Sequence, residues 1–320
     1  MSEFQLLHHI YSANRNLASS VIIPPGDDMA MLQLSGSRIL AAVDQLIDGR
    51  HFNLKSTPLN LIARKAIARS VSDIAAMAAH PSACLVAAIL PPDFPAQRAN
   101  ELFDHMRAAA ESFHCPLIGG DIAFHSSPSH PLTLSVTVLA EPRFIHDQSS
   151  GGVAHFGAVT RSGAQPSDLL CVTGLLGGSL EPSGLGRHLT FEPRVNLALA
   201  LAETLGPRLH AMIDISDGLG RDASHIAESS NVTIHVDASA IPCNPGVTLR
   251  NALSDGEDYE LLFTAQPPIP TSLLNIPITT IGRILPPNPS SPHRVFLIEN
   301  NTQTPIDHLG WEHSAERAGD

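Results

Sequence analysis

Two aspartates, Asp214 and Asp217, stand where an apolar segment of the sequence ends and a helical pattern begins. Residues 211–213 are apolar, and apolar residues recur at helical spacing from Leu219 onward. Ser216 lies where it would cap the N-terminus of that helix. Carboxylates beside a helix N-terminus can hold a hydrated metal ion and the phosphate that the metal carries. A capped turn with two solvated aspartates is an equally good interpretation of this segment taken alone.

The same arrangement, an acidic residue at the end of an apolar segment, occurs in four other motifs. These are GDD (26–28), VD (43–44), SDIAAM (72–77) and GGD (119–121). Oxygen ligands without histidine or cysteine suit Mg²⁺ better than Zn²⁺. If four of these carboxylates converge, only cations can hold them together, because like charges at short range raise each other's pKa values and destabilise the fold. Mg²⁺ is usually shared with substrate phosphates, so the pattern indicates nucleotide chemistry.

Asp73 is expected on a helix that starts at Thr57-Pro58, where a capping residue precedes a proline at the first helical position. Ala66, Ala76 and Met77 stand at spacings that place them on the same helix face as Asp73. An unpaired charge on an apolar face is unfavourable, so this position favours a cation or metal partner over solvated surface.

Strands and helices are expected to alternate in both halves of the chain, which favours two layered α/β domains. The clearest expected strands are 39–43, 83–90, 132–141, 168–173 and 278–284. Two further helices are expected at about 95–113 and 193–205. The glycines of PLIGGD are expected to let a ligand approach the backbone closely. Residues 142–157 are polar and rich in Gly, Ser and His, so we place the domain boundary there, with domains at 1–145 and 146–320.

The composition excludes several classes of function. The formal net charge of −12 argues against nucleic acid and anionic membranes as partners, whereas metal ions could supply the charge that a phosphorylated substrate needs. The sequence contains no GxxxxGK(S/T) loop, which excludes a P-loop kinase. The four cysteines show neither a CxxC pair nor zinc spacing, the start lacks a secretory signal pattern, and no apolar run reaches the length of a membrane span. We therefore expect a cytoplasmic enzyme.

Nine stretches together resemble the thiamine-monophosphate kinase family, in the superfamily that includes aminoimidazole ribonucleotide synthetase. They are Gly26-Asp27-Asp28, VDQLIDGRHF (43–52), SDIAAMAAHP (72–81), IGGD (118–121), RSGAQPSDLLCVTGLLGGS (161–179), RHLTFEPRV (187–195), HAMIDISDGLGRD (210–222), GEDYELLFT (256–264) and GWEH (310–313). They follow the order of the family over almost the whole chain, so the match is far more specific than any single motif.

The resemblance implies an architecture and a reaction. The fold would be α/β in two layered domains: an N-terminal domain whose sheet pairs with that of a second subunit in a homodimer, and a C-terminal α/β domain. The γ-phosphoryl group of ATP would pass directly to thiamine monophosphate, with Mg²⁺, giving thiamine diphosphate and ADP. The acceptor phosphate ionises at about pH 6 and is already a nucleophile at neutral pH, so no general base is required. Alignment and charge neutralisation would supply the catalysis.

Site residues are implied by their positions in the matching motifs. The magnesium ligands would be Asp27, Asp44, Asp73, Asp121, Asp214 and Asp217, of which Asp44, Asp121 and Asp217 would serve the transfer itself. The ATP contacts would be Gly119, Gly120, Arg161 and Ser216. The thiamine contacts would be His51, Glu257 and Trp311, with Trp311 as a stacking surface for the cationic ring and Glu257 as its counter-charge. Without the motifs, a lone tryptophan is more often a core residue, and His51 beside Phe52 could be simple packing.

The chain departs from the family pattern close to these carboxylates. The family usually has hydroxyl residues at Ala42-Val43, asparagine at Ser70, glycine at Ala78 and threonine at Ile122. These changes leave the carboxylates intact and remove several neutral ligands. Water is therefore expected to replace a protein ligand beside Asp44, because Mg²⁺ readily retains water.

Two other functions are compatible with the pattern. One is another ATP-dependent enzyme of the superfamily, acting on an amide, carbamoyl or selenide group. The reactive cysteines expected near the N-terminus or at the C-terminus of two such enzymes have no counterpart here, since the first cysteine is Cys84 and the sequence ends AERAGD. The other is a non-catalytic nucleotide-binding protein, which would have no need of six carboxylates.

Overall fold

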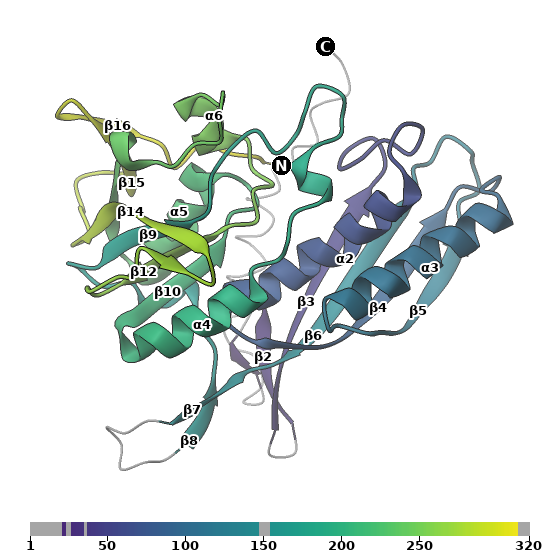
Figure 1. The fold of residues 1–320 in the computed structure, drawn as a ribbon, viewed down its shortest axis with the longest axis horizontal. Coiled ribbons are helices and arrows are strands. Elements are labelled where there is room, and N and C mark those ends of the chain that lie inside the picture. The colour runs from purple at the N-terminus through teal and green to yellow at the C-terminus, as the bar shows by residue number, and fades with distance from the viewer. Residues whose placement is uncertain (1–20, 24–26, 35–36, 147–153, 313–320) are drawn as a thin grey trace.

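Helix α2 (Leu59–Ala76) lies between two β-sheets (Figure 1). The computed structural model describes residues 21–23, 27–34, 37–146 and 154–312. Most side chains of α2 are buried, because the helix packs on the first sheet and also on α4 (Val195–Leu205) and β10 (Leu209–Asp214) of the second half. A helix that is apolar on nearly every side is stable only when it is covered in this way. Within the described chain, no helix combines the length and apolar composition that a membrane span needs.

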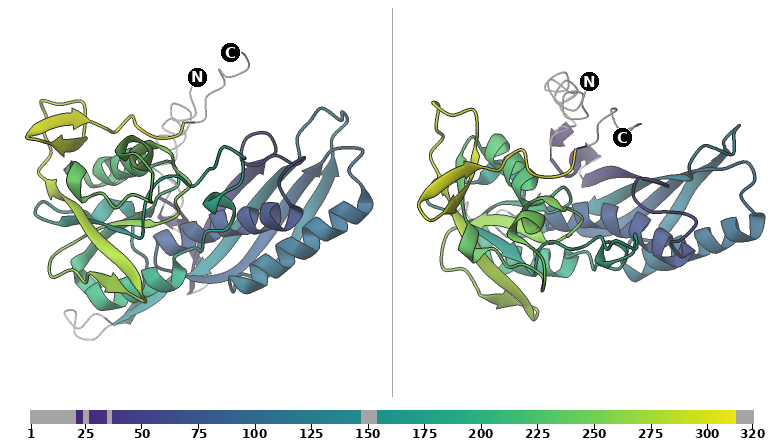
Figure 2. Two further views of the ribbon diagram at one scale, coloured as in Figure 1. Left: turned by 45° about the horizontal axis from the view of Figure 1, so that its top comes forward. Right: turned by 90° about the horizontal axis from the view of Figure 1, so that it is seen from above.

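The first sheet has six strands in the order β1-β2-β3-β6-β4-β5. Their bounds are β1 (Val21–Ile23), β2 (Ala30–Leu34), β3 (Ser37–Ile47), β4 (His80–Leu90), β5 (Leu117–Phe124) and β6 (Thr133–Glu141). Strands β4 and β5 are parallel and are connected by α3 (Ala96–Ser112), while the other neighbouring pairs are antiparallel. Helices α2 and α3 cover one face of the sheet (Figure 2), so side chains along β6 alternate between buried and partly exposed.

Large apolar side chains are exposed on the strands of this sheet. Those on β3, β4 and β5 are Val43, Leu85, Ile89, Ile118, Ile122 and Phe124, and Ile22 on β1 is exposed as well. Val43 is 63% exposed, although it ends an apolar run in the sequence. Apolar surface gathered on neighbouring strands typically marks an interaction site.

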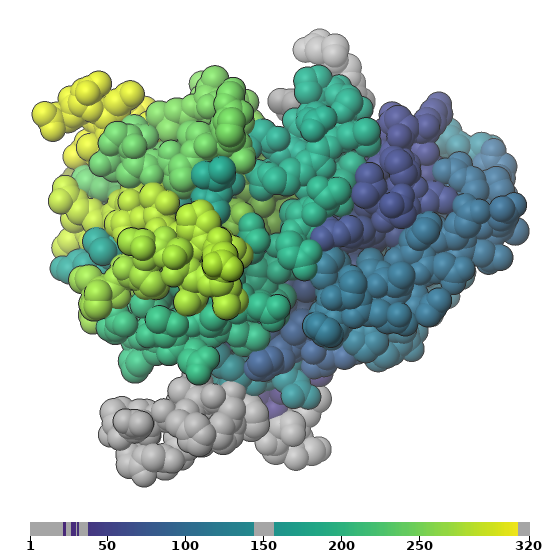
Figure 3. Space-filling view, in the orientation of Figure 1, coloured from purple at the N-terminus to yellow at the C-terminus, as the bar shows by residue number. Residues whose placement is uncertain are grey.

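The second sheet has eight strands in the order β10-β12-β9-β14-β11-β15-β16, with β13 paired to β14. The bounds not yet given are β9 (Leu169–Thr173), β11 (Thr233–Asp237), β12 (Leu261–Ala265), β13 (Ser272–Leu273), β14 (Ile276–Leu285), β15 (Val295–Glu299) and β16 (Thr302–Pro305). Helices α5 (Leu219–Ser230) and α6 (Leu249–Ser254) belong to the same half. A hairpin of β7 (Arg143–His146) and β8 (Ala154–Gly157) lies between the two sheets in the chain. In the space-filling view, the teal-green segment between β9 and α4 stands at the surface between the two halves (Figure 3).

The α/β fold class predicted from the sequence is confirmed, and each strand and helix predicted above is present to within a few residues. The predicted start of α2 was wrong in its details. Pro58 occupies the cap position and Leu59 is the first helical residue. The hydroxyl of Thr57 accepts a hydrogen bond of 3.3 Å from the backbone N–H of Asn53, so it does not cap the helix.

The conformation at the end of α2 shows why glycine is favoured at the position where this chain has Ala78. Ala78 has a φ of 50°, its N–H donates to the carbonyl of Ala75 (2.9 Å), and the N–H of Ala79 donates to the carbonyl of Ile74 (3.2 Å). This is a Schellman motif, in which glycine is the favoured left-handed residue. An alanine in this conformation is strained by roughly 1–2 kcal/mol, which is the physical reason for a glycine at this position.

Candidate active site

Three carboxylates from separate elements converge beside α2. Asp28 precedes β2, Asp73 lies on α2, and Asp214 ends β10. One oxygen of each carboxylate lies within 4.8 Å of the others. Ser72, next to Asp73, donates a hydrogen bond of 2.5 Å to Asp214 and so connects α2 to the end of β10. Two of the predicted magnesium ligands are therefore brought together, and Asp28 joins them. We call these three residues the carboxylate cluster.

Arg161 is the counter-charge of this region. Its guanidinium pairs with Asp28, and its backbone N–H donates to Asp27 over 3.0 Å. The sequence prediction made Arg161 an ATP contact, whereas the structure shows it paired with these two aspartates. Asp28 was missed by the sequence analysis, although the signal was present, because the second aspartate of GDD has the same chemistry as the first.

Burial is the main cause of the electrostatic strain in this region. It raises the pKa of Asp214 to about 7, with the charge of Asp28 adding to the effect. Burial and the charge of Asp44 raise the pKa of Asp73 well above its usual value, and burial with the charge of Asp28 raises the pKa of Asp27 to about 6. The raised pKa values show that these carboxylates ionise unfavourably without a bound cation. An oxygen-only donor set fits Mg²⁺.

Asp44 lies at the edge of the carboxylate cluster, on β3. It accepts a hydrogen bond of 3.3 Å from Ser70, and its carboxylate is 3.9 Å from the guanidinium of Arg69. Ser70 takes the position where the family usually has asparagine, so its hydroxyl replaces an amide as the neutral partner of Asp44. Asp44 is close enough to Asp73 for its charge to raise the pKa of that residue.

Asp217 belongs to a neighbouring group with Asp222 and His225, whose ligand atoms lie within 4.8 Å of one another. The prediction that Ser216 caps α5 was wrong. Gly218, with a φ of 117°, occupies the cap position, and the Asp222 carboxylate accepts the N–H groups of Asp217 and Gly218 at 3.0 Å each. An acidic side chain inside the first turn therefore satisfies the helix N-terminus, as the helix dipole favours.

The GGD motif does not join the carboxylate cluster within one chain. Asp121 lies on the edge strand β5, which is three strands from Asp44 on β3, or about 14 Å at the usual strand spacing. The close approach expected for its glycines is to protein, because a Cβ on Gly120 would lie 1.9 Å from the carbonyl oxygen of Val86 on β4. Gly119 lies on the same exposed strand.

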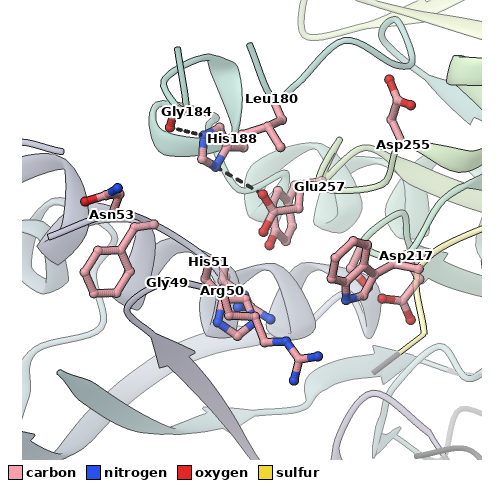
Figure 4. Close-up of a pocket in the computed structure, with 15 residues that line it drawn as sticks. Gly49, Arg50, His51, Asn53, Leu180, Gly184, His188, Asp217, Asp255 and Glu257 are labelled. Carbon is pink, nitrogen blue, oxygen red and sulfur yellow. Dashed lines mark hydrogen bonds and ion pairs between the residues drawn. The ribbon is translucent and has the colours of Figure 1, made fainter. Parts of the chain in front are cut away.

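The three residues predicted on the thiamine side lie together in one cavity of about 270 Å³. Figure 4 shows His51 and Arg50 on one wall, His188 and Glu257 on another, and Asp217 beside them. Trp311 also lines the cavity and is 45% exposed, so it is not a core residue. Phe52, next to His51, is buried in the core and also contributes to the cavity lining.

Backbone carbonyls of the 214–218 loop hold two other segments of the cavity wall in place. The N–H of Glu257 donates to the carbonyl of Ser216 (2.7 Å), and the N–H of Trp311 donates to the carbonyl of Asp217 (2.8 Å). Both Ser216 and Asp217 line the cavity themselves. Segments that lie far apart in the sequence are thus attached to the loop that follows β10. Gly26 and His313 of the matched motifs lie outside the described residues.

Lys65 is a fully buried cation next to this cavity. Its ammonium donates to the carbonyl of His51 (2.8 Å), to Glu257 (2.8 Å) and to Nδ1 of His188 (2.7 Å). Nε2 of His188 lies 3.4 Å from the carbonyl of Gly184. Nδ1 of His188 also lies 3.1 Å from the Glu257 carboxylate, so Lys65, His188 and Glu257 form one polar group beside the cavity.

Glu257, predicted as the counter-charge of the thiamine ring, is already paired with Lys65. Burial raises its pKa, but the contact with His188 and the charges of Lys65 and Arg69 outweigh burial and bring the pKa to about 2. Burial lowers the pKa of Lys65 to about 8, so both partners are charged at neutral pH. This pair was not predicted from the sequence. Its signal was a polar stripe at a spacing of four, Lys65, Arg69 and Asp73, on an otherwise apolar helix.

A second cavity, of about 460 Å³, adjoins the first. The residues that line both are Arg50, His51, Arg69, Ser216 and Asp217. Asp44 lines the second cavity but not the first, and Trp311 lines the first but not the second. The two cavities therefore join an acidic end, suited to metal-bound phosphates, to an aromatic end, suited to a flat organic ring, and two substrates could meet at their boundary.

Comparison with protein families gives one match over the first half of the chain. The family model described as "AIR synthase related protein, N-terminal domain" matches residues 26–141. These residues include strands β2 to β6 with helices α2 and α3.

Three similar proteins carry the same name or a related one. Thiamine-monophosphate kinase of Rhodopirellula baltica is 33% identical over 307 residues, which cover 88% of this chain and 89% of the relative. Thiamine-monophosphate kinase of Mycobacterium tuberculosis is 31% identical over 99% of this chain and 92% of the relative. A solved structure described as "AaThiL complexed with AMPPCP and TMP" aligns with a TM-score of 0.77 at 27% identity, covering 98% of this chain and 97% of that one.

Proposed function

The chain belongs to the thiamine-monophosphate kinase family, and we propose that it transfers the γ-phosphoryl group of ATP to thiamine monophosphate, giving thiamine diphosphate and ADP. One observation carries the proposal. The adjoining cavities offer carboxylates for metal-bound phosphates at one end and Trp311 for a heteroaromatic ring at the other. The acceptor phosphate would lie at their boundary, which is where the transfer must take place.

Magnesium is the cation that fits the acidic end. Asp44 and Asp217 line this end. The carboxylate cluster of Asp28, Asp73 and Asp214 lines neither cavity, but it lies close to Asp44 and, with Asp27 beside it, would hold the ion. When bound, Mg²⁺ supplies positive charge to the phosphates and removes the repulsion that raises the pKa values of these residues. The protein's own part is to fix the carboxylates on α2 and at the end of β10, which are rigid elements.

The aromatic end would bind the thiamine group of the substrate. Trp311 presents a half-exposed indole, and a cationic ring over an indole is stabilised by about 0.5–2 kcal/mol. Glu257 contributes less charge than the sequence suggested, since it is paired with Lys65. Its role would be to shape the wall together with His51 and His188. No side chain has to remove a proton, because the acceptor phosphate is already ionised.

We propose that a second copy of the chain completes the site. Six large apolar side chains are exposed on β3, β4 and β5, which is the kind of surface that a homodimer buries. Asp121 lies on β5 among them, about three strand spacings from Asp44. In a two-fold dimer, Asp121 of the partner subunit could reach the metal beside Asp44, together with the GGD glycines.

Mixing two inactive variants tests this arrangement. Asp44→Asn and Asp121→Asn should each lose turnover. If each site takes Asp44 from one subunit and Asp121 from the other, subunits exchanged at equal amounts should regain about a quarter of the wild-type activity, since half the dimers carry one intact site of two. No recovery after verified exchange would place both residues in sites of a single chain or outside the site.

The same proposal includes a domain boundary and a cellular location. The domains would be 1–145 and 146–320, divided at the β7–β8 hairpin. A cytoplasmic location would suit the four cysteines, which are all free thiols, three of them buried.

The decisive assay is ADP release from ATP and Mg²⁺ with and without thiamine monophosphate. We expect release that depends on thiamine monophosphate and stops when divalent metal is fully chelated. ADP release that does not depend on thiamine monophosphate would favour another ATP-dependent enzyme of the superfamily. Tight binding of ATP without any release of ADP would favour a nucleotide-binding protein.

A further inference from the structure

Arg69 stands at the boundary between the two cavities. It lies on the polar stripe of α2, one turn from Lys65 and one turn from Asp73, and it lines both cavities. Its side chain is 15% exposed, so most of the guanidinium is shielded from water. Arg50 lines the same two cavities, but it is exposed, and its charge is therefore more strongly screened.

The guanidinium of Arg69 makes few contacts for its number of donors. Nη1 donates to the carbonyl of Gln45 over 3.2 Å, and Nη2 stands 3.9 Å from Asp44, which is too far for a hydrogen bond. Nε is buried and has no hydrogen-bond partner among the described residues. A guanidinium has five N–H donors, and a buried donor without a partner is unfavourable.

The charge of Arg69 is held in place by acidic neighbours. Burial lowers the pKa of Arg69, but neighbours that include Asp44 and Glu257 raise it by more, and a guanidinium is protonated at every working pH. Glu257 is already paired with Lys65, and Asp44 is not within hydrogen-bond distance. The structure therefore holds a buried cation with unused donors at the place where two substrates' phosphates would meet.

We infer that Arg69 is a catalytic residue that binds phosphoryl oxygens at this boundary, an inference that rests on the proposed function. A planar guanidinium can donate two parallel hydrogen bonds to one phosphoryl group. An oxygen of the acceptor phosphate forms a bond to the γ-phosphorus of ATP, and the bond from that phosphorus to the β–γ bridging oxygen breaks. ADP leaves with the electron pair, and Arg69 keeps its protons while it stabilises the charge on the transferring oxygens.

Arg69 could instead serve only to neutralise Asp44. The two roles differ in which ligands they affect. A residue that binds phosphoryl oxygens distinguishes thiamine monophosphate from thiamine, whereas a structural counter-charge affects both ligands equally or neither. Arg64 provides a matched control on the same helix, because it pairs with Glu192 and Phe191 and lines neither cavity.

The experiment compares Arg69→Gln, Arg69→Lys and Arg64→Gln with the wild type. Calorimetry measures the affinity for thiamine and for thiamine monophosphate, with Mg²⁺ and with chelator, and ADP release gives kcat. We expect Arg69→Gln to bind thiamine monophosphate at least 10-fold more weakly, to bind thiamine unchanged, and to lose at least about 100-fold in kcat. Arg69→Lys should recover part of both losses, and Arg64→Gln should behave like the wild type.

Equal weakening of both ligands by Arg69→Gln, or no weakening of either, would overturn the inference. If Arg69→Gln fails to fold, Arg69→Lys keeps the charge beside Asp44 and loses the planar fork, so unchanged affinity and kcat in that variant would overturn it as well. Failure of the proposed function looks different. In that case the wild type and Arg64→Gln would also show no ADP release that depends on thiamine monophosphate.

Discussion

Replacing Asp214 with asparagine should make the protein more stable when no divalent metal is present. Asp214 is 3% exposed and shares the carboxylate cluster with Asp28 and Asp73. Its pKa is raised to about 7, first by burial and then by the charge of Asp28. Asparagine removes the charge and can still accept the hydrogen bond from Ser72 through its amide oxygen.

The size of the effect follows from linkage. The raised pKa means that the folded protein binds the Asp214 proton more tightly than the unfolded chain, so folding stability falls as pH rises from the unfolded pKa of 3.8 through about 7. Above that range the ionised group destabilises the fold by up to about 4 kcal/mol, taken from the shift at 1.36 kcal/mol per unit. Shared protons and local relaxation reduce this, so we expect about 1–3 kcal/mol, or about 2–6 °C in Tm.

The assay is thermal unfolding in chelator between about pH 5 and pH 7.5. Asp214→Asn should melt higher than the wild type at the upper pH, and the difference should shrink by half or more at the lower one. Added Mg²⁺ should reverse the order, because a ligand that binds the folded state stabilises the wild type. Asp168→Asn is the matched control, since this buried aspartate is paired with His210 at 2.9 Å and its loss should lower Tm. A lower Tm for Asp214→Asn in chelator at the upper pH would refute the argument that the cluster is repulsive.

Three further predictions concern residues in the two cavities or next to them. Trp311→Ala should raise KM for thiamine monophosphate about 5-fold or more with little change in KM for ATP, while Trp311→Phe keeps most of the stacking, as initial-rate kinetics would show. Ala42→Ser with Val43→Thr should lower the Mg²⁺ concentration for half-maximal activity, and because Val43 is 63% exposed its packing loss within one chain should be small. An unchanged Mg²⁺ requirement in the folded double variant would mean that these positions never contact metal. Lys65→Met should lower stability by about 3–5 kcal/mol in denaturant unfolding, and adding Glu257→Gln should restore part of it, because the first change leaves a buried charge unpaired.

Local patterns in the sequence were sufficient for the secondary structure. Alternating and helical spacings predicted β4, β6, α3 and α4 closely, because each pattern reports which side of one element is buried. The errors lie at element ends, where side chains compete for backbone groups. Asp222, rather than Ser216, satisfies the N-terminus of α5, and Thr57 bonds to the preceding loop instead of capping α2. The sequence alone does not show which of several neighbouring acceptors will bind a given backbone N–H group.

Motifs along the chain were enough to identify the kinase family and to predict oxygen ligands at the ends of apolar segments, which suit Mg²⁺ and phosphates. Which of these groups come into contact depends on the three-dimensional packing of the elements. It joins Asp28 to the carboxylate cluster, leaves Asp121 three strands away, and pairs Lys65 with Glu257 across 192 positions of the chain. Strand order and long-range ion pairs arise from the packing of whole elements around α2. A periodicity reports only the buried side of one element, so it carries no record of which partner that side will meet.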